Sequence, residues 1–141
     1  MTQQHPPPLR LLFVCVENSN RSQMAEAFAR MLGGEAVEAH SAGSAPSGAI
    51  HPKAVAAMAE LGYDLTRHRS KSLAELPDVA FDAAVTMGCG DACPAVKARL
   101  REDWDIPQPK DMPPEEFRQV RDQVRRQVVE LLAKALKRND E

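Results

Sequence analysis

The apolar segment LRLLFVCV, residues 9–16, is the feature that most restricts the fold of this chain. Only Arg10 interrupts it, and it is too short to be a membrane span. A continuous apolar run of this length is typical of a strand buried on both faces, as in parallel sheets that helices cover. We therefore expect an α/β fold with residues 9–16 as an interior strand.

Helical and extended patterns alternate along the rest of the chain. Helical spacing starts at Ser22 and stops at the glycines at 33 and 34, where a helix can end. Further helices are predicted over residues 51–62 and 113–136, and further strands over residues 35–43, over 81–87 and near Trp104 and Asp105. This alternation predicts parallel strands joined by crossover helices.

Length and charge limit the class of protein. The chain has 141 residues, which suits one domain, and we expect residues 1–9, with three consecutive prolines, to be a disordered leader before a domain over 10–141. A net charge of -2 gives no general nucleic-acid footprint. Neither a signal peptide nor a membrane span is visible. We expect a cytoplasmic monomer with three reduced cysteines that binds neither nucleic acid nor membrane.

Cys15 ends the predicted first strand, and ligands of open α/β sheets bind at that end of the strands. Five residues separate Cys15 from Arg21, and a helix is predicted to follow at once. A loop of this length can curl its N–H groups around one tetrahedral oxyanion, and the helix N-terminus adds partial positive charge. The predicted oxyanion loop consists of Val16, Glu17, Asn18, Ser19 and Asn20, followed by Arg21.

The side chains of this stretch suit nucleophilic chemistry. Arg21 can offer a two-pronged donor to an oxyanion. The positive surroundings stabilise a thiolate at Cys15, and Ser22 is placed to donate a hydrogen bond to that sulfur. The loop has no glycine, so we expect Asn18 or Asn20 at positive φ, and Glu17 pointing outward. The alternative for Cys15 is a buried, inert strand-end thiol.

Three ordered motifs carry a family resemblance. CVENSNRSQMAEAF (15–28), HSAG (40–43) and VTMGCGDACP (85–94) resemble the low-molecular-weight protein tyrosine phosphatase superfamily, most closely its arsenate reductase branch. The resemblance implies a single-domain, four-stranded parallel sheet in the order 2-1-3-4 with helices on both faces, a phosphatase I or flavodoxin-like fold. It implies a thiol-dependent oxidoreductase in which Cys15 attacks arsenate, a phosphate-like oxyanion.

Two more cysteines, Cys89 and Cys93, follow the third predicted strand and leave the sheet at the same edge as Cys15. The resemblance implies that oxidation passes from Cys15 to one of them and then to the other. Thioredoxin-linked relatives have a Cys-x6-Cys pair, whereas this Cys-x3-Cys segment resembles relatives that use a low-molecular-weight thiol such as mycothiol with mycoredoxin. The reductant stays open between thioredoxin and such a thiol. Idle thiols or a metal site are alternatives for the pair.

The general acid of the family has no match here. Its phosphatases carry an Asp-Pro late in the chain, where this chain has Gln108 before Pro109. An amide cannot donate and retake a proton, so Asp105 or Asp111 would have to substitute. Trp104 either contacts substrate or packs at the edge of the core. The missing acid disfavours phosphotyrosine hydrolysis, but a phosphatase of tyrosyl or small phosphate esters remains the alternative enzyme, and a non-catalytic anion sensor the alternative of another class.

The resemblance also implies a potassium ion beside the loop and no tightly bound cofactor. Its ligands would be Asn18, Glu26, Ser41 and Asp64, since a hard cation accepts oxygen ligands. Without the ion, Asn18 and Ser41 would brace the loop, and the two carboxylates would be unrelated to it.

Overall fold

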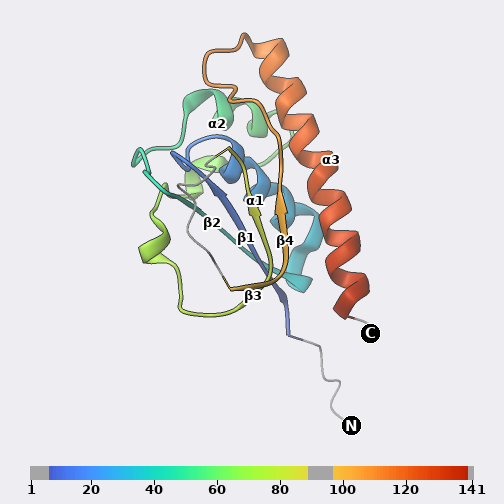
Figure 1. Ribbon diagram of the computed structural model, residues 1–141. Helices are drawn as coiled ribbons and strands as arrows, with labels where there is room; N and C mark the ends of the chain where they lie inside the picture. Colours follow the sequence, from blue (N-terminus) through green and yellow to red (C-terminus); the bar gives the residue numbers. More distant parts are fainter. Residues whose placement is uncertain (1–6, 89–96, 140–141) are drawn as a thin grey trace.

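The fold is an α/β structure of alternating strands and helices (Figure 1), described over residues 7–88 and 97–139 of a computed structural model. In chain order the main elements are β1 (Leu9–Cys15), α1 (Arg21–Gly33), β2 (Val37–Gly43), α2 (Pro52–Ala59), β3 (Phe81–Thr86), β4 (Ala98–Asp103) and α3 (Pro114–Asn139). Three short 3-10 helices, η1 (Gly34–Ala36), η2 (Leu65–Arg67) and η3 (Leu73–Glu75), lie between them. Within the described ranges, no helix combines the length and apolarity needed to cross a membrane.

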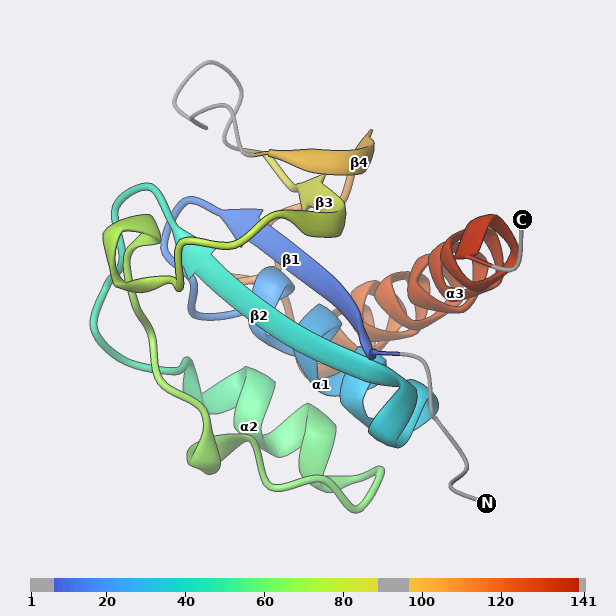
Figure 2. The same ribbon diagram turned by 90° about the horizontal axis from the view of Figure 1, so that it is seen from below.

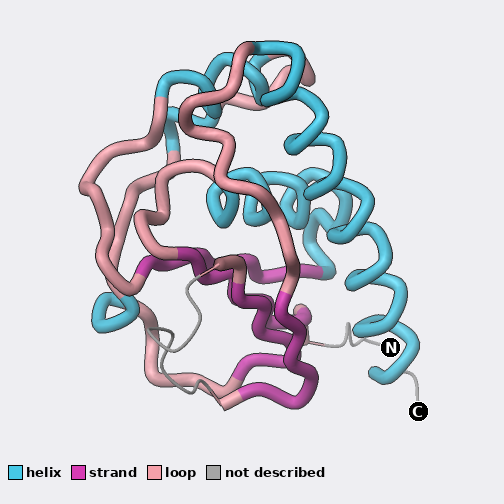
Figure 3. The backbone as a smooth tube through the Cα atoms, turned by 45° about the horizontal axis from the view of Figure 1, so that its top comes forward, coloured by secondary structure: helices cyan, strands magenta, loops and turns pink. Residues whose placement is uncertain are grey.

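The sheet has the order β2-β1-β3-β4 with every pair parallel, which confirms the predicted topology. Its strands lie side by side in Figure 3. Cys15 at the end of β1 is paired with Gly43 of β2, and Val14 with Thr86 of β3. Parallel pairing in this register brings the carboxyl ends of three strands to one edge, where a site is expected.

The fourth strand differs from its predicted position. It covers Ala98–Asp103 and ends just before Trp104, whose N–H still donates to Thr86 O at 2.8 Å. The residues of β4 alternate between half-buried and exposed, so the strand lacks the apolar run that marks β1. The second strand likewise starts at Val37 rather than Glu35, because residues 34–36 form a 3-10 turn.

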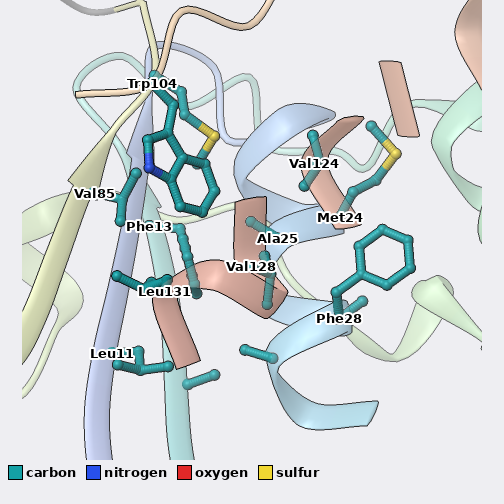
Figure 4. Close-up of a cluster of buried hydrophobic side chains, with 14 of the residues drawn as sticks. Leu11, Phe13, Met24, Ala25, Phe28, Val85, Trp104, Val124, Val128 and Leu131 are labelled. Carbon is teal, nitrogen blue, oxygen red and sulfur yellow. The ribbon is translucent and has the colours of Figure 1, made fainter. Parts of the chain in front are cut away.

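One face of the sheet carries the main core. Phe13 of β1 and Trp104 pack against each other, with ring centroids 5.9 Å apart, beside α1 and α3 residues such as Ala25 and Val128 (Figure 4). All three α-helices contribute to this cluster, and Figure 2 shows them on the same side of the sheet. Each fully buried side chain of the size of valine, leucine or phenylalanine contributes about 1.5–3 kcal/mol to stability.

The opposite face has a smaller cover. Leu12 and Val14 of β1 point to this side and contact Leu73, Leu76 and neighbouring residues of the segment that contains η3. Helical turns therefore lie on both faces, as the family resemblance implies, but the α-helices of the described chain lie on one face only. The connection after β2 runs past the carboxyl edge of the sheet, where its N–H groups bond the loop after β1.

Candidate functional site

The loop after β1 is shaped by its carbonyl groups. Donors outside the loop take these carbonyls: Ser44 N bonds Cys15 O (3.2 Å), Ala45 N bonds Val16 O (2.9 Å), Ser47 N bonds Glu17 O (3.0 Å) and His51 N bonds Ser19 O (3.1 Å). In a trans peptide the next N–H points opposite to the carbonyl. The N–H groups that follow therefore face the inside of the loop. Within the described part of the chain, the N–H groups of residues 17, 18 and 20 donate to no acceptor, so they are available to an anion.

Asn18 fixes the loop from within. Its φ is +52°, which confirms one of the two predicted candidates, whereas Asn20 has a φ of -125°. The Asn18 Oδ1 accepts from Lys71 N (3.0 Å) and Gln23 Nε2 (2.8 Å), and a backbone N–H can only donate. This sets the amide orientation, so Nδ2 is the atom that donates to Ser22 Oγ at 2.8 Å.

Cys15 is buried and meets Ser22 directly, with Sγ and Oγ 2.8 Å apart. Ser22 Oγ already accepts from Asn18, so its own hydrogen is available for the sulfur. The contact lies where the sequence placed it, and the support of a thiolate by Ser22 stays a prediction.

A Ser22→Ala variant tests this contact. Loss of a hydrogen bond to a charged group costs about 1.5–3 kcal/mol, so alkylation of Cys15 by iodoacetamide at pH 6 should slow roughly tenfold or more. Inorganic phosphate should protect the wild-type thiol. The matched control is Ser47→Ala, because Ser47 is exposed and its hydroxyl bonds Ala49 O. Equal alkylation rates in the two variants would show that Ser22 does not support the thiolate.

Arg21 begins α1 and lies between two chain segments beside the loop. Its side chain is buried, and NH1 donates to Ile106 O at 3.0 Å. A Cβ added at Gly88, which has a φ of +79°, would be only 2.6 Å from the same NH1. The Nε has no partner among the described residues, so the guanidinium keeps donors for an anion.

The carboxylate of Glu17 lies 4.0 Å from the ammonium of Lys110, and its predicted outward orientation stays a prediction. Lys53 at the start of α2 donates to the carbonyls of Lys110 (3.0 Å) and Met112 (2.9 Å), which holds the segment after Trp104 beside the loop.

A buried chain of polar groups behind the loop was not predicted. Gln23 is fully buried, and its Nε2 donates to Asn18 and to Arg69 O. Its Oε1 must then accept from His68 Nδ1 (3.0 Å), which leaves His68 Nε2 to accept from Tyr63 OH (2.6 Å). Burial lowers the pKa of His68 more than Glu26 raises it, which agrees with this neutral tautomer.

The direction of these bonds is uniform. Each donor from Tyr63 through His68, Gln23, Asn18 and Ser22 faces the next group toward the Cys15 sulfur. The sequence offered one signal for it, a glutamine on the buried face of α1 directly after Ser22. The partners come from a segment about 45 residues later, which no local pattern connects to the loop.

The predicted acids remain at the surface. Asp105 and Asp111 are exposed, and Asp105 adjoins Ile106, the residue whose carbonyl contacts Arg21. Trp104 is 5% exposed and donates to Glu102 Oε1 at 2.8 Å, so it packs in the core and does not line an opening. Cys89 and Cys93 lie outside the described residues.

The predicted potassium ligands do not form a set. Ser41 donates to Glu26 Oε1 at 2.6 Å, and Asn18 Oδ1 is taken by two donors, but Asp64 is exposed and accepts from Thr66. In addition, the Lys71 ammonium lies 3.8 Å from Glu26 Oε1, and Arg30 lies 2.9 Å from Oε2. These cations already balance the buried carboxylate, which disfavours the potassium ion that the resemblance implies.

Comparisons with known proteins point to one family. Residues 10–141 match the family model described as low molecular weight phosphotyrosine protein phosphatase. The chain is 38% identical to a glutaredoxin arsenate reductase of Synechocystis sp., over 89% of this chain and 97% of that protein. A solved arsenate reductase in a phosphate-binding state aligns with a TM-score of 0.83 and 37% identity, covering 90% of this chain and 98% of that one. The thioredoxin-dependent arsenate reductase of Corynebacterium glutamicum aligns with a TM-score of 0.76 and 32% identity, covering 92% of this chain and 63% of that one.

Proposed function

Because this chain belongs to the low molecular weight phosphotyrosine protein phosphatase family, and within it to the arsenate reductase branch, we propose that it reduces arsenate to arsenite. The observation that carries the proposal is the 2.8 Å contact of Cys15 Sγ with Ser22 Oγ beside a ring of inward N–H groups. A supported thiolate next to an oxyanion cradle suits attack on a tetrahedral oxyanion.

The first step forms a bond between the Cys15 sulfur and As(V). One As–O bond breaks, and that oxygen leaves as water after protonation. The N–H groups of the loop and Arg21 hold the remaining oxygens and stabilise their charge. The position of Arg21, between Ile106 O and Gly88, supports this role because its fork is fixed before substrate arrives.

The second step needs another thiol. Its thiolate attacks the Cys15 sulfur, an S–S bond forms, and the electron pair of the S–As bond stays with arsenic. Arsenite, As(III), then leaves, and the two thiols have supplied both electrons. We propose Cys89 for this thiol and Cys93 for the next transfer. Support comes from Gly88, which precedes Cys89 in sequence and lies against Arg21. A thiol system such as thioredoxin, glutaredoxin or a low-molecular-weight thiol would reduce the resulting disulfide and return the cysteines to thiols.

A phosphatase of this family would use Cys15 and Arg21 in the same way. Two observations disfavour it here. Position 108 carries an amide, and Trp104, the aromatic residue nearest that segment in sequence, is buried. Asp105 is the candidate proton donor for the departing arsenate oxygen, which needs less help than a phenolate.

Substrate preference tests this assignment. The wild type should reduce arsenate when a thiol system is supplied, and should hydrolyse p-nitrophenyl phosphate far better than phosphotyrosine. Gln108→Asp should raise phosphotyrosine hydrolysis, by up to the factor of about 10² to 10⁴ attributed to a positioned acid. Gln119→Asp, an exposed position on α3, controls for the added charge. Efficient phosphotyrosine hydrolysis by the wild type without arsenate reduction would make the phosphatase the better assignment.

Potassium should have no specific effect on arsenate reduction. Lys71 and Arg30 already balance Glu26, so no ligand set remains for the ion. Steady-state rates in potassium chloride and in sodium chloride of equal ionic strength should agree within about twofold, because the two salts screen charges equally. A several-fold activation by potassium alone would restore the original expectation.

A further inference from the structure

A cavity lies behind the oxyanion loop, between α1 and the segment that follows α2. Its volume is about 360 Å³, and its lining includes Glu26, Arg30, Tyr63, Arg67, Arg69 and Lys71. None of the lining residues belongs to the loop or contributes to the Arg21 contacts. The size falls within the range of small-ligand sites, about 300–1,000 Å³.

The charge of this cavity is strongly unbalanced. Four of its lining residues are arginine or lysine, and Glu26 is its one carboxylate. Glu26 is 3% exposed, and both of its oxygens are engaged, Oε1 by Ser41 and Oε2 by Arg30. The carboxylate of the cavity is therefore buried, while the side chains of Arg67 and Arg69 are exposed to solvent.

The cations keep donors for a ligand. Arg67 is exposed and forms no ion pair within residues 7–88 and 97–139. Lys71 donates to Arg69 O at 3.3 Å, which uses one of its three hydrogens. Burial lowers the pKa of Lys71, Glu26 opposes that effect, and the nearby Arg69 and Arg30 lower it further. Arg69 pairs with Glu75 through NH1, which leaves its other N–H groups. Guanidinium groups suit the geometry of phosphate oxygens.

We propose that this cavity is a binding site for a diphosphate group, either as free pyrophosphate or as part of a nucleoside diphosphate. The lining offers three cations, Arg67, Arg69 and Lys71, which suit two linked phosphates even though Arg69 also pairs with Glu75 and Lys71 lies beside Glu26. Tyr63 forms an aromatic wall beside them, with its hydroxyl engaged by His68. The site goes beyond the proposed reaction and does not depend on it.

Titration calorimetry with pyrophosphate tests the site. Arg21→Ala removes the guanidinium from the oxyanion loop, so binding that persists in this variant comes from elsewhere. We expect one pyrophosphate per chain in Arg21→Ala. Adding Arg67→Glu should weaken that binding at least tenfold. The matched control adds Arg125→Glu, which makes the same charge change at an exposed position on α3, and should change binding less than twofold.

ADP in the same titration distinguishes the two sources of the group. Tighter binding of ADP than of pyrophosphate identifies a nucleotide site, and the reverse identifies a site for the free anion. Either result supports the proposal if Arg67→Glu weakens the binding at least tenfold. Absence of pyrophosphate and ADP binding in Arg21→Ala would overturn the proposal. So would equal weakening by Arg67→Glu and Arg125→Glu, which would indicate unspecific attraction.

Discussion

A Cys93→Ser variant should release one equivalent of arsenite per protein and then stop when thioredoxin is the reductant. Cys15 and Cys89 supply the two electrons of the first turnover and end as a disulfide. Without Cys93, oxidation cannot pass onward, so this disulfide should accumulate. Peptide mapping after a single turnover should find Cys15 joined to Cys89. Such a disulfide requires the two Cα atoms to come within about 4.4–6.8 Å of each other.

The Cys89→Ser variant should fail one step earlier. Cys15 can still attack arsenate, but no internal thiol is placed to attack its sulfur, so arsenite release should fall below one equivalent. Hydrolysis of p-nitrophenyl phosphate should stay near the wild-type rate in both variants, which controls for damage to the loop. If both variants cycle normally with mycothiol or glutathione, the internal relay is wrong although arsenate reduction stands. If the wild type reduces no arsenate with any thiol system, the reductase assignment itself is wrong.

Gly43→Ala should reduce arsenate reduction by about 10² or more. A Cβ at residue 43 would lie 2.5 Å from the backbone oxygen of Val16 and 3.1 Å from the backbone nitrogen of Asn18. Neither atom is the end of a flexible side chain, so the loop backbone itself must move. A displacement of about 1 Å in a positioned site can cost about 10² in rate. Kinetics with arsenate, together with phosphate affinity by calorimetry, measure the effect.

Gly34→Ala is the matched control for stability. Its φ is +53°, but nothing lies within 4 Å of an added Cβ, so the change costs about 1–2 kcal/mol in backbone strain without touching the loop. Thermal unfolding should show a lower melting temperature for Gly34→Ala, while the rate of arsenate reduction by this variant remains near the wild-type rate. Full activity in Gly43→Ala would mean that close packing of β2 against the loop does not shape the cradle.

The continuous apolar run of β1 predicted an interior strand of a parallel sheet. Such a strand is buried on both faces, so its sequence does not alternate between apolar and polar residues. The spacing of Cys15 and Arg21 predicted the oxyanion loop for an equally local reason, since five residues and a helix start define its size. Asn18 could be named as a positive-φ residue because few side chains tolerate that conformation. The weak alternation in β4 gave no such signal, and its position was misjudged.

Contacts between distant segments were decided by the tertiary structure alone. The bond from His68 to Gln23 joins residues 45 positions apart, and Lys71 reaches Glu26 across a similar distance. No period or spacing in the sequence encodes such a pair, because it depends on how the segment after α2 returns past α1. The family resemblance implies a potassium ion beside Glu26, and only the fold shows that the Lys71 ammonium lies 3.8 Å from this carboxylate. The local sequence was enough to predict Cys15 as the nucleophile and the loop after it as its cradle, and only the packing of remote segments decided which side chains contact that loop.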